Sequence, residues 1–445
     1  MIEAFKNHIN SKLPFLSNSK CLVACSGGLD SVVLTHLCHE LKLDVTLAHC
    51  NFNLRGNESD TDEAFVLDLG EMLDLEVFIQ NFDTDIYATT EKLSTQMAAR
   101  ELRYDWFSDL AESLKFDYIL TAHHLDDNLE TFLINLTRGT GLQGLTGIPE
   151  INDNIVRPLL QFSREDIEDY AKAHQLTWRE DSSNASDKYL RNKLRHHVIP
   201  VLKETTPELL QNFKKTIDNL SDTADIVEES LRAVAKRAII DIDGDKIIFS
   251  VLEFKKANNP KAYLYEMFKD YGFTAWSDIV DLLDAQPGKQ VFSESYRLVK
   301  DREYLILTRR RSLSGVEVTE SVNEAPIFIN NTDKEIETPI GTLFFDEVDA
   351  IVKPSKKVIF IDKEALNYPL EFRLWKEGDS FQPLGMTGKK KLSKYLKDEK
   401  VSLVDKENTW LLTSNNTVVW VVGKRADDRF KVTPKTKEIL RITIQ

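Results

Sequence analysis

The sequence has few cysteines and no long hydrophobic run, and both absences exclude whole classes of protein. All four cysteines lie within the first fifty of 445 residues, and none belongs to a Cys-x-x-Cys pair. This spacing provides neither a disulfide framework nor a zinc site, so we expect a reducing, cytoplasmic location. No stretch approaches the roughly eighteen apolar residues of a membrane helix, and the N-terminus does not resemble a signal peptide, so we expect neither membrane insertion nor secretion.

An excess of positive charge is also lacking, because the formal net charge is −15. A global charge of this sign disfavours a nucleic-acid partner, yet two local clusters are basic. Four basic and no acidic residues lie between Lys188 and Arg195, and six lysines accompany two acidic residues between Lys389 and Lys400. Either cluster is equally consistent with a solvated basic face and with contact to nucleic acid.

The first two hundred residues alternate between strand and helix patterns. We predict strands at 21–25, 44–50, 75–81 and 118–122, and helices at 32–41, 60–72, 94–114 and 128–136. This alternation predicts an α/β domain with a doubly wound parallel sheet, whose ligands bind beyond the carboxyl ends of the strands.

The rest of the chain has a different texture. The runs 209–236, 261–268 and 276–283 read as helices, 304–308 reads as a strand, and the polar stretch 312–323 reads as a connector. Strand patterns follow at 326–330, 341–346, 357–361 and 418–422. We therefore predict three domains: 1–205 (α/β), 206–312 (mainly helical) and 313–445 (small, mixed or β-rich).

A glycine-rich turn joins the first predicted strand to the first predicted helix. Its residues are Ser26, Gly27, Gly28, Leu29, Asp30 and Ser31. The glycines lack the Cβ atoms that would keep a ligand away, and backbone N–H groups at a helix N-terminus bind anions, so we predict a phosphate site. The alternative is an ordinary strand-to-helix turn.

No lysine follows these glycines, unlike in the Gly-x-x-x-x-Gly-Lys-Ser/Thr loop. The charged residue is Asp30 instead, and a carboxylate beside a polyphosphate needs a divalent cation between them. Mg²⁺ takes one or two carboxylates together with phosphate oxygens. We therefore expect Mg²⁺ on Asp30 and ATP in the loop.

A second segment, 123–131, contains two histidines and three carboxylates. If a helix begins near Asp126, either Asp126 or Asp127 shares a face with Glu130. Such a pair can hold Mg²⁺, bind an ammonium group or accept a proton. Helix capping is the alternative, and it explains one aspartate more readily than the whole group.

Two further segments carry arginines near the predicted edge of the sheet. Arg100 and Arg103 are three residues apart on one helix, where a guanidinium can neutralise charge on a transferring phosphorus. Arg138 opens a glycine-containing loop of basic character. An exposed helix arginine is the competing interpretation of Arg100 and Arg103.

The ordered set of motifs resembles the tRNA(Ile)-lysidine synthetase family, a member of the ATP pyrophosphatase group with an adenine nucleotide alpha hydrolase-like fold. The resemblance is carried by 26–31, 49–60, 99–104, 123–131, 138–141, 181–195, 378–386 with the lysine run, and 422–430. It spans nearly the whole chain and is weakest from about 206 to 350.

The resemblance implies a two-step ligation on the wobble cytidine of a tRNA(Ile) with a CAU anticodon. The cytosine O2 attacks the α-phosphorus of ATP and pyrophosphate leaves; the ε-amine of L-lysine then displaces AMP and lysidine results. The loop 26–31 would hold the pyrophosphate with Asp30 and Mg²⁺, Arg100 would contact phosphate or base, and Asp127 and Glu130 would bind lysine. The implied tRNA contacts are Arg138, Arg191, Arg195, Lys389, Lys390 and Lys391. The resemblance also implies a homodimer.

Three other functions compete with this one. A tRNA thiolase shares the loop but needs cysteines after the adenylation core, and no cysteine follows Cys50. An amide-forming synthetase without RNA would leave the basic C-terminal cluster without a purpose. A non-catalytic tRNA-binding module would not need intact Asp30, Asp127 and Glu130.

Overall fold

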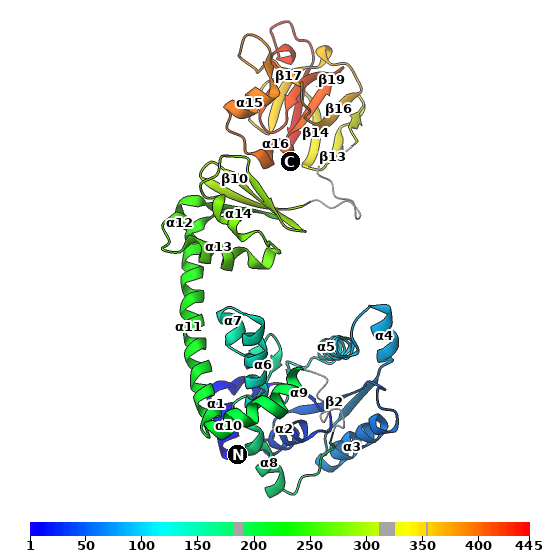
Figure 1. The fold of residues 1–445 in the computed structure, drawn as a ribbon. Helices are drawn as coiled ribbons and strands as arrows, with labels where there is room; N and C mark the ends of the chain where they lie inside the picture. The colour runs from blue at the N-terminus through cyan, green and yellow to red at the C-terminus, as the bar shows by residue number, and fades with distance from the viewer. Residues whose placement is uncertain (181–189, 311–324, 353–354) are drawn as a thin grey trace. The chain divides into compact units, whose positions relative to one another are not determined.

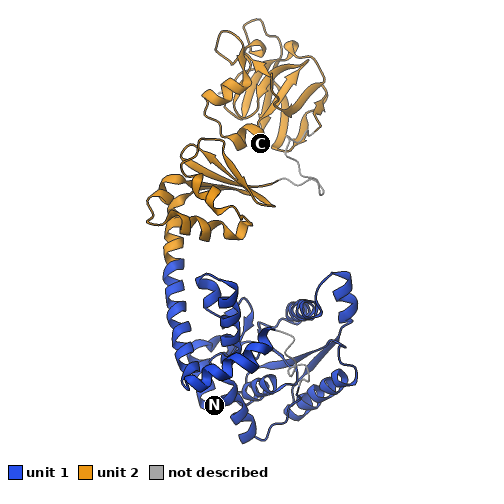
Figure 2. Ribbon diagram, viewed as in Figure 1, with its two compact units in different colours: residues 1–228 blue, residues 229–445 orange. Residues whose placement is uncertain are grey.

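The computed structural model describes residues 1–180, 190–310, 325–352 and 355–445. They form two units, 1–228 and 229–445 (Figure 2), each of which is described by itself. The boundary lies inside the continuous helix α11 (Leu209–Ala238). The three-domain division at 205 and 312 stays a prediction, and the predicted connector 312–323 falls entirely outside the described residues.

Unit 1 is built on a six-stranded sheet with the order β3-β2-β1-β4-β6-β5. Five strands are parallel and the edge strand β5 is antiparallel to β6, which confirms the predicted, mostly parallel α/β sheet. The strands are β1 (Cys21–Ala24), β2 (Val45–Asn51), β3 (Val77–Asn81), β4 (Tyr118–Leu120), β5 (Ile151–Asn152) and β6 (Ile155–Val156).

Helices cover both faces of this sheet (Figure 1). The side chains of Cys21 and Val23 pack with α1 (Ile2–Lys12), α2 (Leu29–Glu40), α3 (Asn57–Leu73) and α8 (Arg164–Ala173). Leu22, between them in β1, packs on the opposite face with Phe107 of α5 (Thr95–Leu114). Strand side chains alternate between the two faces of a sheet, so β1 is buried on both sides and is apolar throughout.

In the second half of unit 1, helices pack on α6 (Leu125–Arg138) through apolar side chains. Leu125 and Leu129 of α6 pack with Ile199 of α10 (Ile199–Thr205) and Phe213 of α11. Between α9 (Leu190–Lys193) and α10 lies a π-helical turn, Leu194–Val198. The short helices α4 (Thr84–Thr90) and α7 (Leu142–Leu145) complete the unit. This packing places the turn Leu194–Val198 beside the first turns of α6.

The predicted elements of unit 1 are all present, with shifted boundaries. The helix predicted at 32–41 begins at Leu29, because Gly28 is its N-cap. The helix predicted at 128–136 begins at Leu125, because a capping box between His124 and Asp127 starts it earlier. Both starts lie directly after strands, so the shift moves the helix N-termini closer to the edge of the sheet where ligands bind.

Unit 2 begins with a sheet that the sequence analysis anticipated only in part. The helical region consists of α11, α12 (Val251–Lys255), α13 (Pro260–Phe268) and α14 (Trp276–Asp281). The predicted strand at 304–308 is confirmed as β11 (Tyr304–Arg309), but it belongs to a five-stranded sheet with the order β7-β8-β11-β10-β9. The other strands are β7 (Ile239–Asp243), β8 (Lys246–Ser250), β9 (Gln290–Phe292) and β10 (Tyr296–Asp301).

The hairpin β7–β8 carries a turn signal that the helical pattern before it obscured. Asp243 pairs with Lys246, so Gly244 and Asp245 form the two-residue loop, and Gly244 at its first position has a φ of +55°.

The end of the chain is β-rich, as predicted. Two sheets, β12-β16-β19-β20-β21 and β13-β14-β22-β15, pack around a core that includes Trp420 and a stacked pair, Phe372 and Trp410. The strands are β12 (Ile327–Ile329), β13 (Glu335–Thr338), β14 (Gly341–Val348), β15 (Val358–Asp362), β16 (Leu370–Leu374), β17 (Ser380–Phe381), β18 (Lys390–Lys391), β19 (Trp410–Ser414), β20 (Thr417–Val421), β21 (Arg425–Ala426) and β22 (Ile439–Ile444). The helices are α15 (Leu392–Asp398) and α16 (Leu403–Glu407).

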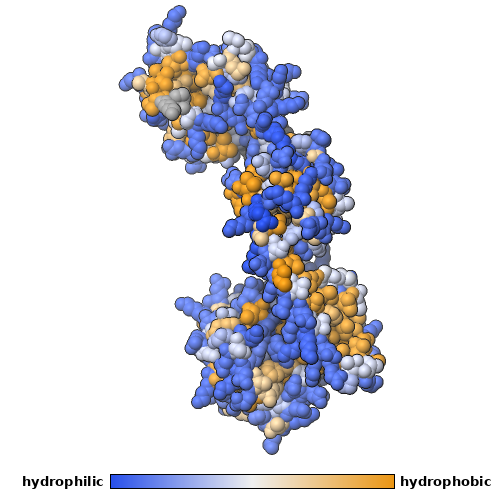
Figure 3. Space-filling view, turned by 90° about the vertical axis from the view of Figure 1, so that its left-hand side faces the viewer, coloured by the Kyte–Doolittle hydropathy of each residue, from blue (hydrophilic) through white to orange (hydrophobic). Residues whose placement is uncertain are grey.

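The described residues include no helix with both the length and the apolar content needed to cross a membrane. On the face drawn in Figure 3, hydrophilic residues predominate and apolar residues form separate patches.

Candidate functional site

The glycine-rich turn after β1 is held in one conformation by bonds within and around it. Gly27 has a φ of +81°, and its carbonyl accepts from the backbone N–H of Arg179 at 2.9 Å. The Ser31 hydroxyl donates to the Gly28 carbonyl at 2.9 Å, and the Gly28 N–H donates to the Ser26 hydroxyl at 3.4 Å. No side chain caps the N-terminus of α2, so its first N–H groups remain available to an anion.

Asp30 lies in the first turn of α2 and is already paired with an arginine. Arg164 Nη1 is 2.6 Å from each carboxylate oxygen of Asp30, and His124 Nε2 is 3.8 Å from Oδ1. No group of three His, Cys, Asp or Glu side chains among the described residues is arranged to hold a metal. A single carboxylate is sufficient to bind Mg²⁺ when phosphate oxygens and water molecules supply the other ligands of the metal ion. It is not sufficient for a metal ion that protein side chains alone coordinate.

The segment after β4 starts α6 and serves partly as a helix cap. The His124 Nδ1 atom accepts from the Asp127 N–H at 3.4 Å, and Asp127 Oδ2 accepts from the His124 N–H at 3.1 Å. Capping therefore accounts for His124 and for one oxygen of Asp127. The other oxygen of Asp127 faces an arginine.

Asp126 has partners of its own, which lie at the start of α8 and in α10. Its Oδ2 accepts from the backbone N–H of Arg164 at 2.8 Å, and its Oδ1 accepts from Lys203 Nζ at 2.6 Å. Asp126 thus ties the starts of α6 and α8 together and bonds to α10. Of the two carboxylate pairs that helical spacing allowed, the structure brings together Asp127 and Glu130.

Arg195 bridges Asp127 and Glu130. Its Nε donates to Glu130 Oε1 at 2.6 Å, and its Nη2 donates to Glu130 Oε2 at 3.0 Å and to Asp127 Oδ1 at 3.2 Å. Arg191 Nε lies 3.4 Å from Glu130 Oε2, and its Nη2 donates to Thr131 at 2.7 Å. Both arginines were predicted to contact tRNA; that role stays a prediction, and their partners within the chain are these carboxylates.

The two carboxylates have opposite pKa shifts. Glu130 is only 1% exposed, and burial raises its pKa although Arg195 opposes the shift. Burial also raises the pKa of Asp127, but His124, His123 and Arg195 outweigh it, so the net pKa is lowered. The site therefore combines one firmly ionised carboxylate with one whose charged form is disfavoured.

The other predicted residues near the sheet edge are more loosely connected. The Arg100 guanidinium lies 4.8 Å from the centre of the Tyr104 ring, and the backbone of Arg100 is in α5. His123 Nδ1 is 3.0 Å from the Thr121 hydroxyl, and burial lowers the pKa of His123 to about 4, so this imidazole is neutral near pH 7. A phosphate or base contact for Arg100 stays a prediction.

Sequence reasoning missed two arginines that contact the site. Arg164 follows the capping serine of α8, and Arg179 donates through its side chain to Asp62 at 3.0 Å and through its backbone to Gly27. Neither lies in a charge cluster or glycine motif, so no local signal marks them. Lys188 and the motif 181–184, by contrast, were singled out in the sequence but lie outside the described residues.

The remaining predicted tRNA contacts are on the surface of their units. Arg138 is exposed at the end of α6. Lys389, just before β18, and Lys391, within it, are exposed, whereas Lys390 Nζ is 2.8 Å from Asp398 Oδ2. The net positive charge of this lysine cluster is therefore partly balanced.

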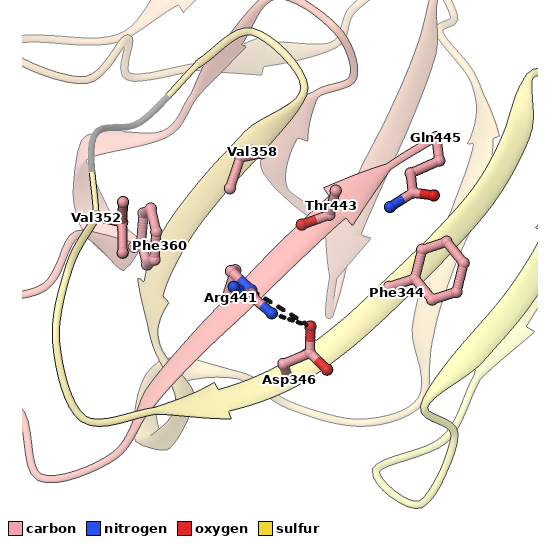
Figure 4. A pocket seen from close by; sticks show the side chains of 8 residues that line it. All are labelled: Phe344, Asp346, Val352, Val358, Phe360, Arg441, Thr443 and Gln445. Carbon is pink, nitrogen blue, oxygen red and sulfur yellow. Dashed lines mark hydrogen bonds and ion pairs between the residues drawn. The ribbon is translucent and has the colours of Figure 1, made fainter.

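Two of the cavities in the described residues are not lined by any of the predicted catalytic residues. One, of about 410 Å³, lies on the sheet β13-β14-β22-β15 of unit 2 (Figure 4). Phe344 and Phe360 line it, with the ion pair between Arg441 Nη2 and Asp346 Oδ2 at 2.8 Å. The other, of about 280 Å³, lies between α6 and α11 within unit 1.

Comparison with known proteins assigns most of the chain to family models. A PP-loop domain matches residues 1–202, a TilS substrate binding domain matches 242–310, and a TilS substrate C-terminal domain matches 370–443. The chain is 40% identical over 442 residues to the tRNA(Ile)-lysidine synthase of Parabacteroides distasonis, covering 99% of each chain. It is 38% identical to that of Bacteroides thetaiotaomicron, covering 97% of each, and 30% identical to that of Clostridium perfringens, covering 96% of each.

Replacing Gly27 with alanine is expected to weaken ATP binding by about tenfold or more. A left-handed φ costs a non-glycine residue roughly 1–2 kcal/mol, and the new Cβ would lie 3.3 Å from Phe65 Cδ1. Calorimetric titration with ATP measures the effect. Gly244→Ala is the matched control, since it has a positive φ but open space around it. Equal affinity of Gly27→Ala and wild type would contradict a phosphate-binding role.

Proposed function

The chain belongs to the tRNA(Ile)-lysidine synthase family, and from this premise we propose how its residues perform the reaction. The protein is an ATP-dependent ligase that joins L-lysine to the wobble cytidine of tRNA(Ile). The observation that carries this function is the match to a synthase over 99% of both chains. The CAU anticodon and the adenylated cytidine intermediate are part of the proposal.

The first step takes place at the glycine-rich loop. The cytosine O2 forms a bond to the α-phosphorus of ATP, and the bond from that phosphorus to the leaving pyrophosphate breaks. The N–H groups at the start of α2 bind the pyrophosphate, and Mg²⁺ held by Asp30 would neutralise its charge. The loop geometry and the uncapped helix N-terminus support these roles.

The second step uses the carboxylates of α6. The ε-amine of lysine attacks C2 of the adenylated cytosine, AMP leaves, and the amine loses a proton. We propose that Asp127 and Glu130 bind a lysine ammonium group, because Arg195 already shows that a cation fits between them. The raised pKa of Glu130 suits it to accept a proton.

The cysteines argue against thiolation, the nearest alternative. Burial raises the pKa of all four thiols, and to about 12 for Cys21 and Cys50. A thiol with such a pKa supplies almost no thiolate at neutral pH, so none is suited to sulfur transfer. The cytoplasmic location and the homodimer stay predictions.

A direct test is incubation with CAU-anticodon tRNA(Ile), ATP, Mg²⁺ and radiolabelled L-lysine, followed by nucleoside analysis. We expect label in lysidine, with release of AMP and pyrophosphate, only when all components are present. Asp30→Asn is expected to keep its circular dichroism spectrum and lose turnover. Absence of labelled nucleoside with wild-type protein, or labelling without tRNA, would refute the proposed reaction.

For the carboxylates, Asp127→Asn and Glu130→Gln are each expected to raise the KM for lysine about tenfold or more, because each removes a charge-assisted hydrogen bond. The KM for ATP should change less than about twofold. Asp109→Asn, an exposed carboxylate on α5, serves as the control and should change neither constant. Parallel increases in both KM values would contradict a specific lysine site.

For tRNA, the triple variant Lys389→Ala, Lys390→Ala, Lys391→Ala is expected to raise the KM for tRNA more than the KM for ATP. Binding of tRNA by wild-type protein should also weaken steeply with added salt, because lysine–phosphate contacts release counterions. A control triple variant at the exposed lysines 334, 356 and 357 removes the same charge elsewhere. An equal effect of both variants would argue against a tRNA contact at β18.

A further inference from the structure

Arg164 is positioned by several bonds that are independent of its contact with Asp30. Its backbone N–H donates to Asp126, and the capping box of Ser163 and Asp166 begins α8 at this residue. Its Nε donates to Glu168 Oε1 at 3.2 Å. Because α8 also packs on α2 through the buried core, the guanidinium is held beside the start of α2.

The contact with Asp30 occupies the atoms that Mg²⁺ would use. Arg164 Nη1 lies 2.6 Å from both oxygens of the carboxylate. A cation that binds Asp30 therefore has to displace this guanidinium. The Asp30 side chain is 28% exposed and the Arg164 side chain is 40% exposed, so both have room to change partners.

A displaced Arg164 would remain next to the loop that receives the triphosphate. The positive N-terminus of α2 and the glycines 27 and 28 lie directly before Asp30 in the chain. Guanidinium groups bind phosphate oxygens through paired N–H donors, and their rigid planar fork loses little freedom for each hydrogen bond formed. Phosphate is thus a chemically matched replacement for the carboxylate.

We propose that Arg164 is a further nucleotide-binding residue, which pairs with Asp30 before the nucleotide binds and pairs instead with a phosphate oxygen of ATP when Mg²⁺ binds Asp30. This inference rests on the proposed function in so far as the loop takes Mg²⁺ and ATP. Two other roles compete with this one. In the first, the ion pair between Arg164 and Asp30 is purely structural; in the second, Arg164 only blocks the binding of metal to Asp30.

The competing roles predict different results for one measurement. Calorimetric titration of the full chain with ATP in excess Mg²⁺, without tRNA, is compared for wild type and Arg164→Ala. Exchange predicts that the variant binds ATP about tenfold more weakly, since it lacks one charge-assisted phosphate contact. An unchanged affinity would indicate a purely structural ion pair, and a tighter affinity would indicate that Arg164 only blocks Asp30. Either result would overturn the proposal.

A double-mutant cycle in EDTA provides a second, independent measurement. Without metal, Asp30→Asn removes a negative charge and also releases Arg164 from its ion pair. The substitution should therefore increase ATP affinity more in the wild-type background than in an Arg164→Ala background. Charge effects alone would be additive, and equal gains in the two backgrounds would therefore count against exchange. This comparison does not depend on catalytic activity.

Two further variants control for fold and charge. Lys172→Ala removes the same charge from the same helix, where Lys172 Nζ is 3.8 Å from Glu168 Oε2, and should leave ATP affinity unchanged. Arg164→Lys keeps the charge and should bind ATP with intermediate affinity if Arg164→Ala proves unstable. If wild-type protein fails to bind ATP, the proposed function fails; if it binds ATP and Arg164→Ala binds equally well, only this inference fails.

Discussion

Buried negative charge at the start of α6 is the constraint on which the arrangement of unit 1 depends. Glu130 is almost fully buried, and an unpaired carboxylate in such a place would be strongly destabilising. The cationic side chains that pair with these carboxylates come from later in the chain. Arg195 and Arg191 pair with Glu130, and Lys203 pairs with Asp126. The segment from α9 to α10 must therefore fold back over α6, where apolar contacts of Ile199 and Phe213 reinforce the same position.

The proposed ligand sites coincide with places that arginine side chains occupy. The guanidinium of Arg195 lies between Asp127 and Glu130, where we propose that lysine binds. The guanidinium of Arg164 lies on Asp30, where we propose that Mg²⁺ binds. In both cases hydrogen bonds from a positively charged side chain hold carboxylate oxygens in place. Such preorganisation lowers the free-energy cost of assembling charged groups when the substrate binds.

Much of the fold could be predicted because its signals are local. The strand–helix alternation, the Gly27–Gly28 turn and the His123–Thr131 segment each lie within a few residues, and all occur where predicted. Helix starts at Leu29 and Leu125 were placed too late, because capping by Gly28 and His124 extends each helix beyond its apolar pattern. Only one of the five strands in the sheet β7-β8-β11-β10-β9 was predicted, since short strands between helices show little periodicity.

The sequence alone determined which chemistry is present: an aspartate after a diglycine turn, and a group of carboxylates after a later strand. It could not determine which carboxylate has which partner, because Arg164 is 134 residues from Asp30 and Arg195 is 65 residues from Glu130. Tertiary folding alone gave Asp126 its bonds to the Arg164 backbone and to Lys203, and placed Asp127 and Glu130 against the guanidinium of Arg195. The physical reason is that helical spacing restricts which side chains share a face, whereas the pairing of buried charges depends on chain segments that meet only in the folded protein.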